Sequence, residues 1–279
     1  MSELFLERRP AALDPLPAGY RTLFDRLLAV VEPDERIRAM WLSGSLARGV
    51  ADAGSDLDVI LAVRDDDFAE FAASWQEWLA TVTPTVLARP LPHAAGCFYS
   101  TTPECLRLDV ITEPVAGLPD TPHRRRLVVL DRDELDAVVP DPATQPGPNR
   151  ERMASLVEEF LRQHAIFPAM VAREDWLCVA VGVQQAQAML YQLFVEANQP
   201  LPPMGVKQWS AKLTPSQRAV LEGLPGPSPQ PGSVIPAMRA TAAVWRSEGR
   251  STLEAHGVDW PAELDDAVAR HCDRELGAD

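Results

Sequence analysis

The sequence lacks several features that would identify a membrane, secreted or zinc protein. No apolar run approaches the ~18 residues that a membrane helix needs, and the first residues lack the basic start and apolar stretch of a secretory signal. The four cysteines and five histidines are scattered, without the close spacing of a zinc site. We therefore expect a cytoplasmic protein with reduced cysteines and no membrane partner.

Basic residues are also scarce, and lysine is almost absent. Asp and Glu number 40 against 26 Lys and Arg, which gives a formal net charge of −14. Such a surface repels phosphate backbones, so we expect no nucleic-acid partner, whereas a small polycation would be attracted. The only two lysines, Lys207 and Lys212, stand out for that reason.

The chain does contain ample apolar material for packed cores. With 279 residues and 46% hydrophobic composition, it has room for two domains of about 140 residues each. A stretch rich in proline and glycine at 141–149 has the composition of a linker. We therefore predict a first domain over 1–140 and a second over 150–279.

Hydrophobic patterns predict different secondary structure in the two halves. In the first half, amphipathic helices at 17–31 and 66–81 accompany short apolar runs typical of strands. These runs lie at 37–42, 56–61, 84–88, 96–100, 106–112 and 126–130. The second half has helical spacing over 151–166, 174–198, 234–246 and 261–275. The predicted fold class is α+β, a mixed β-sheet with flanking helices followed by an α-helical bundle domain.

The most informative stretch is residues 41–63, which read WLSGSLARGVADAGSDLDVILAV. The turn at Gly44-Ser45 has no side chain at the glycine, so its backbone N–H groups can approach an anion such as a triphosphate. Asp56 and Asp58 open the next strand and project from one face, about 6.6 Å apart. Carboxylates this close repel unless a cation lies between them, and Mg²⁺ is a hard cation that oxygen ligands select. The pattern therefore predicts a site for magnesium and a triphosphate.

The segment GSLARGVADAGSDLDV resembles the signature of the polymerase β-like nucleotidyltransferases, with Gly-Ser, Arg-Gly and Ser-Asp-x-Asp in that order. The size and the helical second half look like the antibiotic nucleotidyltransferases, especially the streptomycin/spectinomycin-type aminoglycoside adenylyltransferases. The resemblance implies Mg²⁺-dependent transfer of a nucleoside monophosphate, AMP from ATP, onto a hydroxyl of a small acceptor. That acceptor would be cationic, such as an aminoglycoside-like antibiotic, pyrophosphate would be released, and antibiotic resistance would be the biological context.

The resemblance also implies which acids act at the site. Asp56 and Asp58 would be catalytic metal ligands. Asp109 best matches the family's third carboxylate, which serves as general base or as a shared metal ligand. Glu104 and Glu113 compete with it for this position. A structural alternative for Asp109 is a buried acid paired with an arginine such as the neighbouring Arg107.

The nucleotide-binding residues that the resemblance implies are Gly44, Ser45, Arg48, Ser55 and Lys207. The glycine and the first serine would cradle the β- and γ-phosphates, and the arginine would neutralise their charge or hold the turn. In the resembling enzymes a lysine of the helical domain reaches the triphosphate, and Lys207 is the first candidate for it, with Lys212 second. The alternative for Lys207 is a solvated side chain after a loop.

Two other functions remain open at this stage. The chain could modify a protein or a tRNA, as toxin–antitoxin nucleotidyltransferases do, or it could bind a nucleotide as a sensor without catalysis. The net negative charge counts against tRNA, and an intact set of three acids counts against a sensor. The acceptor and the preferred nucleotide are not defined by the sequence, and either a monomer or a homodimer is compatible with it.

Overall fold

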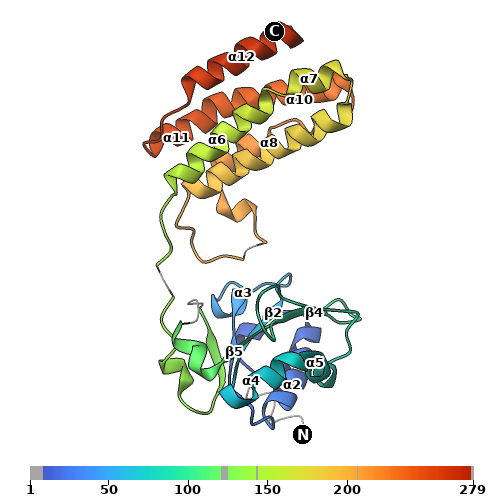
Figure 1. The fold of residues 1–279 in the computed structure, drawn as a ribbon, viewed down its shortest axis with the longest axis vertical. Helices are drawn as coiled ribbons and strands as arrows, with labels where there is room; N and C mark the ends of the chain where they lie inside the picture. The colour runs from blue at the N-terminus through green and yellow to red at the C-terminus, as the bar shows by residue number, and fades with distance from the viewer. Residues whose placement is uncertain (1–8, 121–124, 143, 206, 278–279) are drawn as a thin grey trace. The chain divides into compact units, whose positions relative to one another are not determined.

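The computed structural model describes residues 9–120, 125–142, 144–205 and 207–277. The chain forms two compact units (Figure 1). The first consists of Met1–Thr144 together with the short segment Pro203–Lys207, and the second consists of Gln145–Pro202 and Gln208–Asp279. The strands of the described residues all lie in the first unit, whereas the second unit is helical.

One mixed sheet organises the first unit. Its strands in the described residues are β1 (Ile37–Leu42), β2 (Leu57–Val63), β3 (Leu87–Pro90), β4 (Phe98–Thr101), β5 (Arg107–Pro114) and β6 (Leu127–Asp131). Their order across the sheet is β3-β4-β5-β2-β1-β6. The pair β2–β5 is parallel, and the other neighbouring pairs are antiparallel. Together with its helices, this sheet gives the α+β fold class that the sequence predicts.

The central strands β1 and β2 are almost wholly buried. Their sequences, IRAMWL and LDVILAV, are nearly continuous apolar runs, which is typical of strands with neither face toward solvent. The outer strand β3 (sequence LARP) is exposed or half-buried and begins three residues later than predicted. Since Pro84 has no N–H to donate to a ladder, a start beyond it is favoured.

Helices cover one face of the sheet and form the main core of this unit. They are α2 (Ala18–Val31), α4 (Asp65–Ala73) and α5 (Trp75–Val82). The ring of Trp75 stacks on that of Phe98 with centroids 4.5 Å apart. The sequence pattern predicts one helix over 66–81, but the structure breaks it at Ser74, whose Oγ donates to the carbonyl oxygen of Glu70 at 2.8 Å. This side-chain bond competes with the backbone pattern and divides the segment into two helices.

The opposite face of the sheet carries a smaller apolar cluster around Trp41. The indole Nε1 of Trp41 donates to Asp136 Oδ1 at 2.9 Å. Two short 3-10 helices, η2 (Val115–Asp120) and η3 (Leu135–Ala137), contribute to this cluster. The same face becomes polar where β2 and β5 begin, and the predicted acids lie there.

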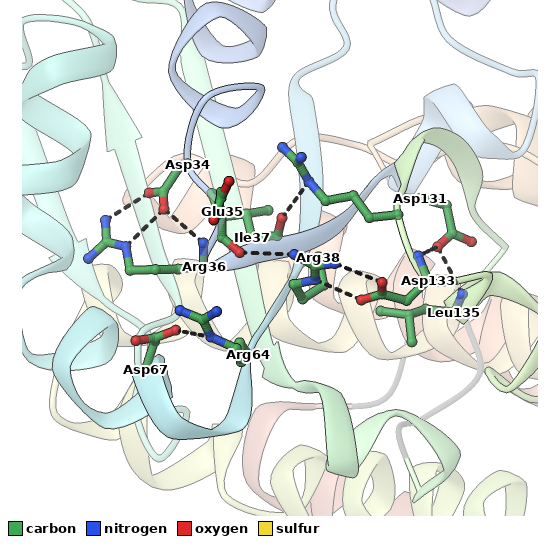
Figure 2. Close-up of polar contacts among 11 residues, drawn as sticks. Asp34, Glu35, Arg36, Ile37, Arg38, Arg64, Asp67, Asp131, Asp133 and Leu135 are labelled. Atoms are coloured by element: carbon green, nitrogen blue, oxygen red, sulfur yellow. Dashed lines mark hydrogen bonds and ion pairs between the residues drawn. The ribbon is translucent and has the colours of Figure 1, made fainter.

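Ion pairs fill the end of the sheet at which β1 begins and β2 ends (Figure 2). Three arginine–carboxylate pairs lie there, namely Arg36–Asp34, Arg38–Asp133 and Arg64–Asp67. The guanidinium of Arg38 donates to both carboxylate oxygens of Asp133, each at 2.7 Å. That of Arg36 donates to both oxygens of Asp34, at 2.9 and 2.7 Å. At this end of the sheet each of the three carboxylates is therefore neutralised by an arginine.

The second unit is built from helices around one long central helix. In the described residues these are α6 (Arg150–His164), α7 (Phe167–Ala172), α8 (Trp176–Ala197), α9 (Pro215–Glu222), α10 (Pro231–Val244), the π-helix η5 (Trp245–Gly249), α11 (Arg250–Ala255) and α12 (Ala262–Leu276). Phe160 stacks on Trp245 with ring centroids 4.5 Å apart, and the Trp245 Nε1 donates to the carbonyl oxygen of Ala186 at 3.0 Å. The long helix α8 buries one face, which includes Val183, Leu190 and Leu193, whereas its apolar residues Leu177 and Val181 are exposed, so its apolar composition does not make it buried all round.

Prolines lie in the first turn of three of these helices, α7, α9 and α10. Pro231 lies in the first turn of α10, which therefore starts before the predicted 234, and Pro168 lies in the first turn of α7. Proline is well tolerated at this position because the N–H it lacks would have no partner within the helix. The unpredicted α9 begins at a capping box formed by Thr214 and Gln217.

None of the helices in the described ranges combines the length and the hydropathy of a membrane span.

Candidate functional site

The parallel pairing of β2 with β5 brings the predicted acids together. In this register Asp58 lies directly beside Asp109. One pleat earlier, Asp56 and Arg107 precede the paired residues Leu57 and Leu108. Because side chains along a strand alternate between faces, three acids and one arginine project from the same face. Of the competing acids, Glu104 lies in the turn before β5 and Glu113 lies four residues beyond Asp109, so Asp109 is the one beside Asp58.

Gly44 forms the wall against which Asp58 rests. It has φ +59°, a conformation that favours glycine, and it begins the short helix α3 (Gly44–Ala47). A Cβ at this position would overlap Oδ2 of Asp58. The strands are tied at the same point, because the N–H of Ser43 donates to the carbonyl oxygen of Asp58 at 2.9 Å. The glycine is therefore needed to bring the turn against the carboxylate.

Negative charge at this face is only partly balanced. Burial raises the pKa of Asp58, and the charge of Asp56 raises it further against the opposing effect of Arg48. Burial, followed by the charges of Asp58 and Asp56, raises the pKa of Asp109 to about 6. An additional cation near these two carboxylates would therefore stabilise their charged forms.

Asp56 differs from the other two acids because it already has two cationic partners. Arg107 and Lys207 each form an ion pair with its carboxylate. The Arg107 guanidinium also donates to the carbonyl oxygen of Gly54 at 3.2 Å. Lys207, one of the two lysines, thus lies at the predicted site within the segment that belongs to the first unit. The sequence left open that Arg107 pairs with Asp109. In the structure Arg107 pairs with Asp56 instead.

The remaining predicted residues have different surroundings. Arg48 lies close enough to Asp58 to lower its pKa, and the buried Arg48 Nε has no hydrogen-bond partner among the described residues. Ser45 is buried in α3, beside the turn. The hydroxyl of Ser55 accepts from the N–H of Asp52 at 3.0 Å and donates to its carboxylate at 3.2 Å, so it holds the turn before β2.

Sequence reasoning did not assign Arg107 to the site. A signal was present, because Arg107 lies two residues before Asp109 and must share its face in a strand. The missing information was the register between β5 and β2, which places it beside Asp56 and not beside Asp109.

The oxygen donors at this face are of the kind that Mg²⁺ takes, and their raised pKa values fit a bound cation. In the described part of the chain, no three Asp, Glu, His or Cys side chains are arranged so as to hold a metal ion. Asp58 and Asp109 are the adjacent pair. Asp56 could join them as a ligand only if its ion pairs with Arg107 and Lys207 opened.

Comparisons with known proteins give structural likeness alone. No protein-family model matches the chain, and no curated protein matches it in sequence. An aminoglycoside 6-adenyltransferase from Bacillus subtilis is similar over 92% of this chain and 98% of its own, with 12% identity and a TM-score of 0.43. A CCA-adding enzyme solved with CTP is similar over 98% of this chain and 72% of its own, with 13% identity and a TM-score of 0.36.

A third likeness extends over the full chain. The Elizabethkingia meningoseptica CdnE cyclic dinucleotide synthase, solved with GTP and Apcpp, is similar over 100% of this chain and 99% of its own, with 11% identity and a TM-score of 0.29. At these identities and scores we base the function proposed below on the residues of the site. The likeness to these three solved proteins is therefore one of structure alone.

Proposed function

We propose that this protein is a Mg²⁺-dependent nucleotidyltransferase that moves AMP from ATP onto a hydroxyl group of a small, cationic acceptor. The observation that carries the proposal is the pairing of Asp58 with Asp109 on adjacent parallel strands, against the bare backbone of Gly44. A merely structural pair of acids would be expected to have basic partners, as at the opposite end of the sheet. Here the pKa of each acid is raised instead.

In the proposed mechanism the chain supplies a base, cationic groups and a close backbone. Asp109 accepts the proton of the acceptor hydroxyl, and its pKa of about 6 suits a base that works near neutral pH. The acceptor oxygen then forms a bond to the α-phosphorus while the bond from that phosphorus to the leaving pyrophosphate breaks. AMP is thereby joined to the acceptor.

The triphosphate would be held by the turn and by the basic groups around it. Gly44 and Ser45 allow the phosphates to approach the backbone, and Arg48, Arg107 and Lys207 provide the positive charge that phosphate oxygens require. Asp56, Asp58 and Asp109 would hold Mg²⁺, which would mask the charge of the phosphates and of the leaving pyrophosphate.

The charge of the whole chain supports a cationic acceptor. A net charge of −14 raises the local concentration of small polycations and repels long nucleic acids. An aminoglycoside-like compound, which carries several amino groups and hydroxyls, has both the charge and the reactive group. On this proposal the enzyme would inactivate such an antibiotic.

The test is to incubate the purified chain with Mg²⁺, ATP labelled at the α-phosphate and a panel of acceptors, and to measure pyrophosphate release and labelled product. The panel should contain aminoglycosides, lincosamides and neutral sugars, so that the requirement for positive charge is tested directly. Parallel reactions with the other nucleoside triphosphates give the preferred donor. A reaction with a cell lysate reports whether a protein or RNA becomes labelled instead.

A matched control comes from the opposite end of the sheet. Asp58→Asn and Asp109→Asn should each abolish transfer, whereas Asp133→Asn, which removes a surface ion pair, should leave it unchanged. Transfer that survives both of the first two substitutions would contradict the mechanism. Label on macromolecules alone would contradict the small acceptor.

A further inference from the structure

The row of side chains that contains Asp58 and Asp109 continues onto the next strand of the sheet. Strand β4 is antiparallel to β5, and in its register Tyr99 lies directly opposite Asp109. Asp58 lies beside Asp109 on the other side. Because paired residues of neighbouring strands project from the same face, the tyrosine and the two acids form one row with Asp109 in the middle.

The face that carries this row is the one that the helices leave uncovered. Phe98 and Ser100, the neighbours of Tyr99 along β4, are buried, and Phe98 stacks on Trp75 of α5. Since side chains alternate along a strand, Tyr99 projects from the opposite face. Its side chain is 38% exposed, whereas that of Phe98 is fully buried. The tyrosine ring is therefore accessible on the face of the acids.

Tyr99 differs from the two other tyrosines of the chain in its lack of a partner. Tyr20 is buried, and its hydroxyl accepts from the N–H of Arg107 at 3.2 Å. Tyr191 stacks on Trp209, and its hydroxyl donates to the carbonyl oxygen of Trp209 at 3.3 Å. Within the residues that the structure describes, the Tyr99 ring has no stacking partner and its hydroxyl no hydrogen-bond partner. An accessible tyrosine of this kind is typical of surfaces that bind another molecule.

The two sides of Asp109 differ in chemistry, and this decides where an acceptor fits. On the β2 side lies Asp58, with the turn at Gly44 against it, and the proposed function assigns these residues to the donor. On the β4 side lies Tyr99. An acceptor hydroxyl has to come within about 2.6–3.2 Å of the Asp109 carboxylate to lose its proton. The body of the acceptor then lies on the β4 side, because the β2 side is needed for the triphosphate.

We propose that Tyr99 binds the acceptor, and that the acceptor presents a saturated, sugar-like ring whose hydroxyl group reaches Asp109. This inference rests on the proposed function and specifies its acceptor. The flat C–H face of such a ring packs on the face of the tyrosine ring, and an ammonium substituent is attracted by the negative charge of the aromatic face. A small hydroxyl compound without a ring would lack this contact.

Arg89 limits how a cationic acceptor can lie on the tyrosine. It follows Tyr99 in the row, on the outer strand β3, and is exposed. Its guanidinium donates to the carbonyl oxygen of Ala88 at 3.1 Å. Its charge repels ammonium groups, whereas the carboxylate of Asp109 on the other side of Tyr99 attracts them. We therefore expect the amino groups of the acceptor to lie toward β5 and not toward β3.

The test compares two substitutions of Tyr99 in the full chain, with Mg²⁺, ATP and the acceptor panel described above. Tyr99→Thr removes the ring and keeps a residue that favours strands, whereas Tyr99→Phe keeps the ring. We expect Tyr99→Thr to raise the KM of the acceptor about tenfold and to leave that of ATP unchanged. Tyr99→Phe should stay within about threefold of the unmodified chain for both substrates. Val128→Ala truncates an exposed side chain of β6, at the other edge of the sheet, and as the matched control should change neither KM.

A binding measurement without nucleotide separates this inference from the proposed function. Because the chain has three tyrosines, labelling with fluorotyrosine gives three fluorine resonances, and the loss of one in Tyr99→Thr assigns that residue. The aminoglycosides and neutral sugars of the panel are titrated at pH 7 and constant ionic strength. We expect at least one of them to shift the Tyr99 resonance saturably, with those of Tyr20 and Tyr191 unmoved as internal references.

An unchanged acceptor KM in Tyr99→Thr would overturn the inference and leave the proposed function intact. An equal rise in the KM of ATP would also overturn it, because the tyrosine would then act on the donor. If the unmodified chain modifies no compound of the panel, the proposed function fails and the fluorine titration decides. A saturable shift confined to Tyr99 supports a ring-binding surface, whereas no shift, or equal shifts of all three tyrosines, overturns it. The titration also decides if thermal unfolding shows that Tyr99→Thr is not folded.

Discussion

Acidic side chains lie at both ends of the strands β1 and β2, and the two groups differ in how their charge is balanced. Where β1 begins and β2 ends, Asp34, Asp67 and Asp133 each pair with an arginine (Figure 2). At the other end, Asp58 and Asp109 lie side by side on neighbouring strands. The same sheet thus carries paired acids at one end and crowded acids at the other.

This difference appears in the proton affinities of the two groups. Hydrogen bonds from Arg38 lower the pKa of Asp133. Burial acts to raise the pKa of Asp34, but the hydrogen bonds and charge of Arg36 more than offset it, so the pKa lies below 3.8. The pKa values of Asp58 and Asp109 are raised. The first end is therefore arranged for stability, whereas the second retains a charge imbalance that a ligand can relieve.

The largest effect is expected from Asp58→Asn. It should reduce nucleotidyl transfer by about 1,000-fold or more, because a metal ligand that contributes several kcal/mol to the transition state is lost. The free energy of unfolding should not fall, since the substitution removes a carboxylate whose charge is disfavoured in the folded state. Pyrophosphate release and urea unfolding measure the two effects. A large loss of stability would mean that Asp58 is a structural residue.

Gly44→Ala should destabilise the end of the sheet that carries Asp58 and Asp109, because it changes the backbone beside Asp58. The substitution forces an alanine into a left-handed conformation and against the Asp58 carboxylate, so we expect a loss of about 2–3 kcal/mol in unfolding free energy. Gly49→Ala is the matched control, because its φ is +69° but no atom lies within 4 Å of the added Cβ. The difference between the two variants isolates the contact with Asp58, and equal losses would show that this contact contributes nothing.

Lys207→Gln separates two roles for the lysine that pairs with Asp56. If the lysine binds the triphosphate, the affinity for a non-hydrolysable ATP analogue with Mg²⁺ should fall about tenfold, the loss expected for one charge-assisted hydrogen bond. Isothermal titration measures this, with Lys212→Gln as the comparison. An unchanged affinity would show that Lys207 does not bind the triphosphate and that its role is to neutralise the charge of Asp56.

The smallest effect is expected from Asp34→Asn, which removes the ion pair with Arg36 at the end of the sheet where β1 begins. Because the pKa of Asp34 is lowered in the folded state, its pairing with Arg36 stabilises the fold above the ordinary pKa of 3.8 and is lost as the pH falls through the folded-state value. Asp34→Asn should therefore cost up to about 1 kcal/mol at pH 7 and less at lower pH. Unfolding midpoints between pH 7 and pH 3 measure this, and a constant difference would contradict the assigned pairing.

Much of the sheet follows from local sequence. The buried strand β1 has the bounds 37–42 that its apolar run predicts, and β2 begins at 57, one residue after the predicted 56, and ends at 63, two residues after the predicted 61. Helix α2 likewise starts one residue after the predicted 17 and ends at 31. The strands were predictable because each is a nearly continuous apolar run, and α2 was predictable because its apolar residues recur at helical spacing and Pro33 follows its end.

Other elements depend on interactions that a linear pattern does not contain. The break at Ser74 depends on one side-chain hydrogen bond, within a segment whose apolar spacing continues across it. The short α9 and α11 are too brief for a periodic signal. The π-helix η5 depends on the packing of Trp245 against Phe160, which are far apart in the sequence.

The sequence alone determined the α+β class, the Gly-Ser turn and the shared face of Asp56 and Asp58, because each follows from residue type and from the two-residue period of a strand. Only the tertiary structure decided that Asp109 lies beside Asp58 and that Arg107 and Lys207 both pair with Asp56. The physical reason is that the register between parallel strands, and the return of a segment 151 residues away to Asp56, are set by packing across the fold and leave no local trace in the sequence.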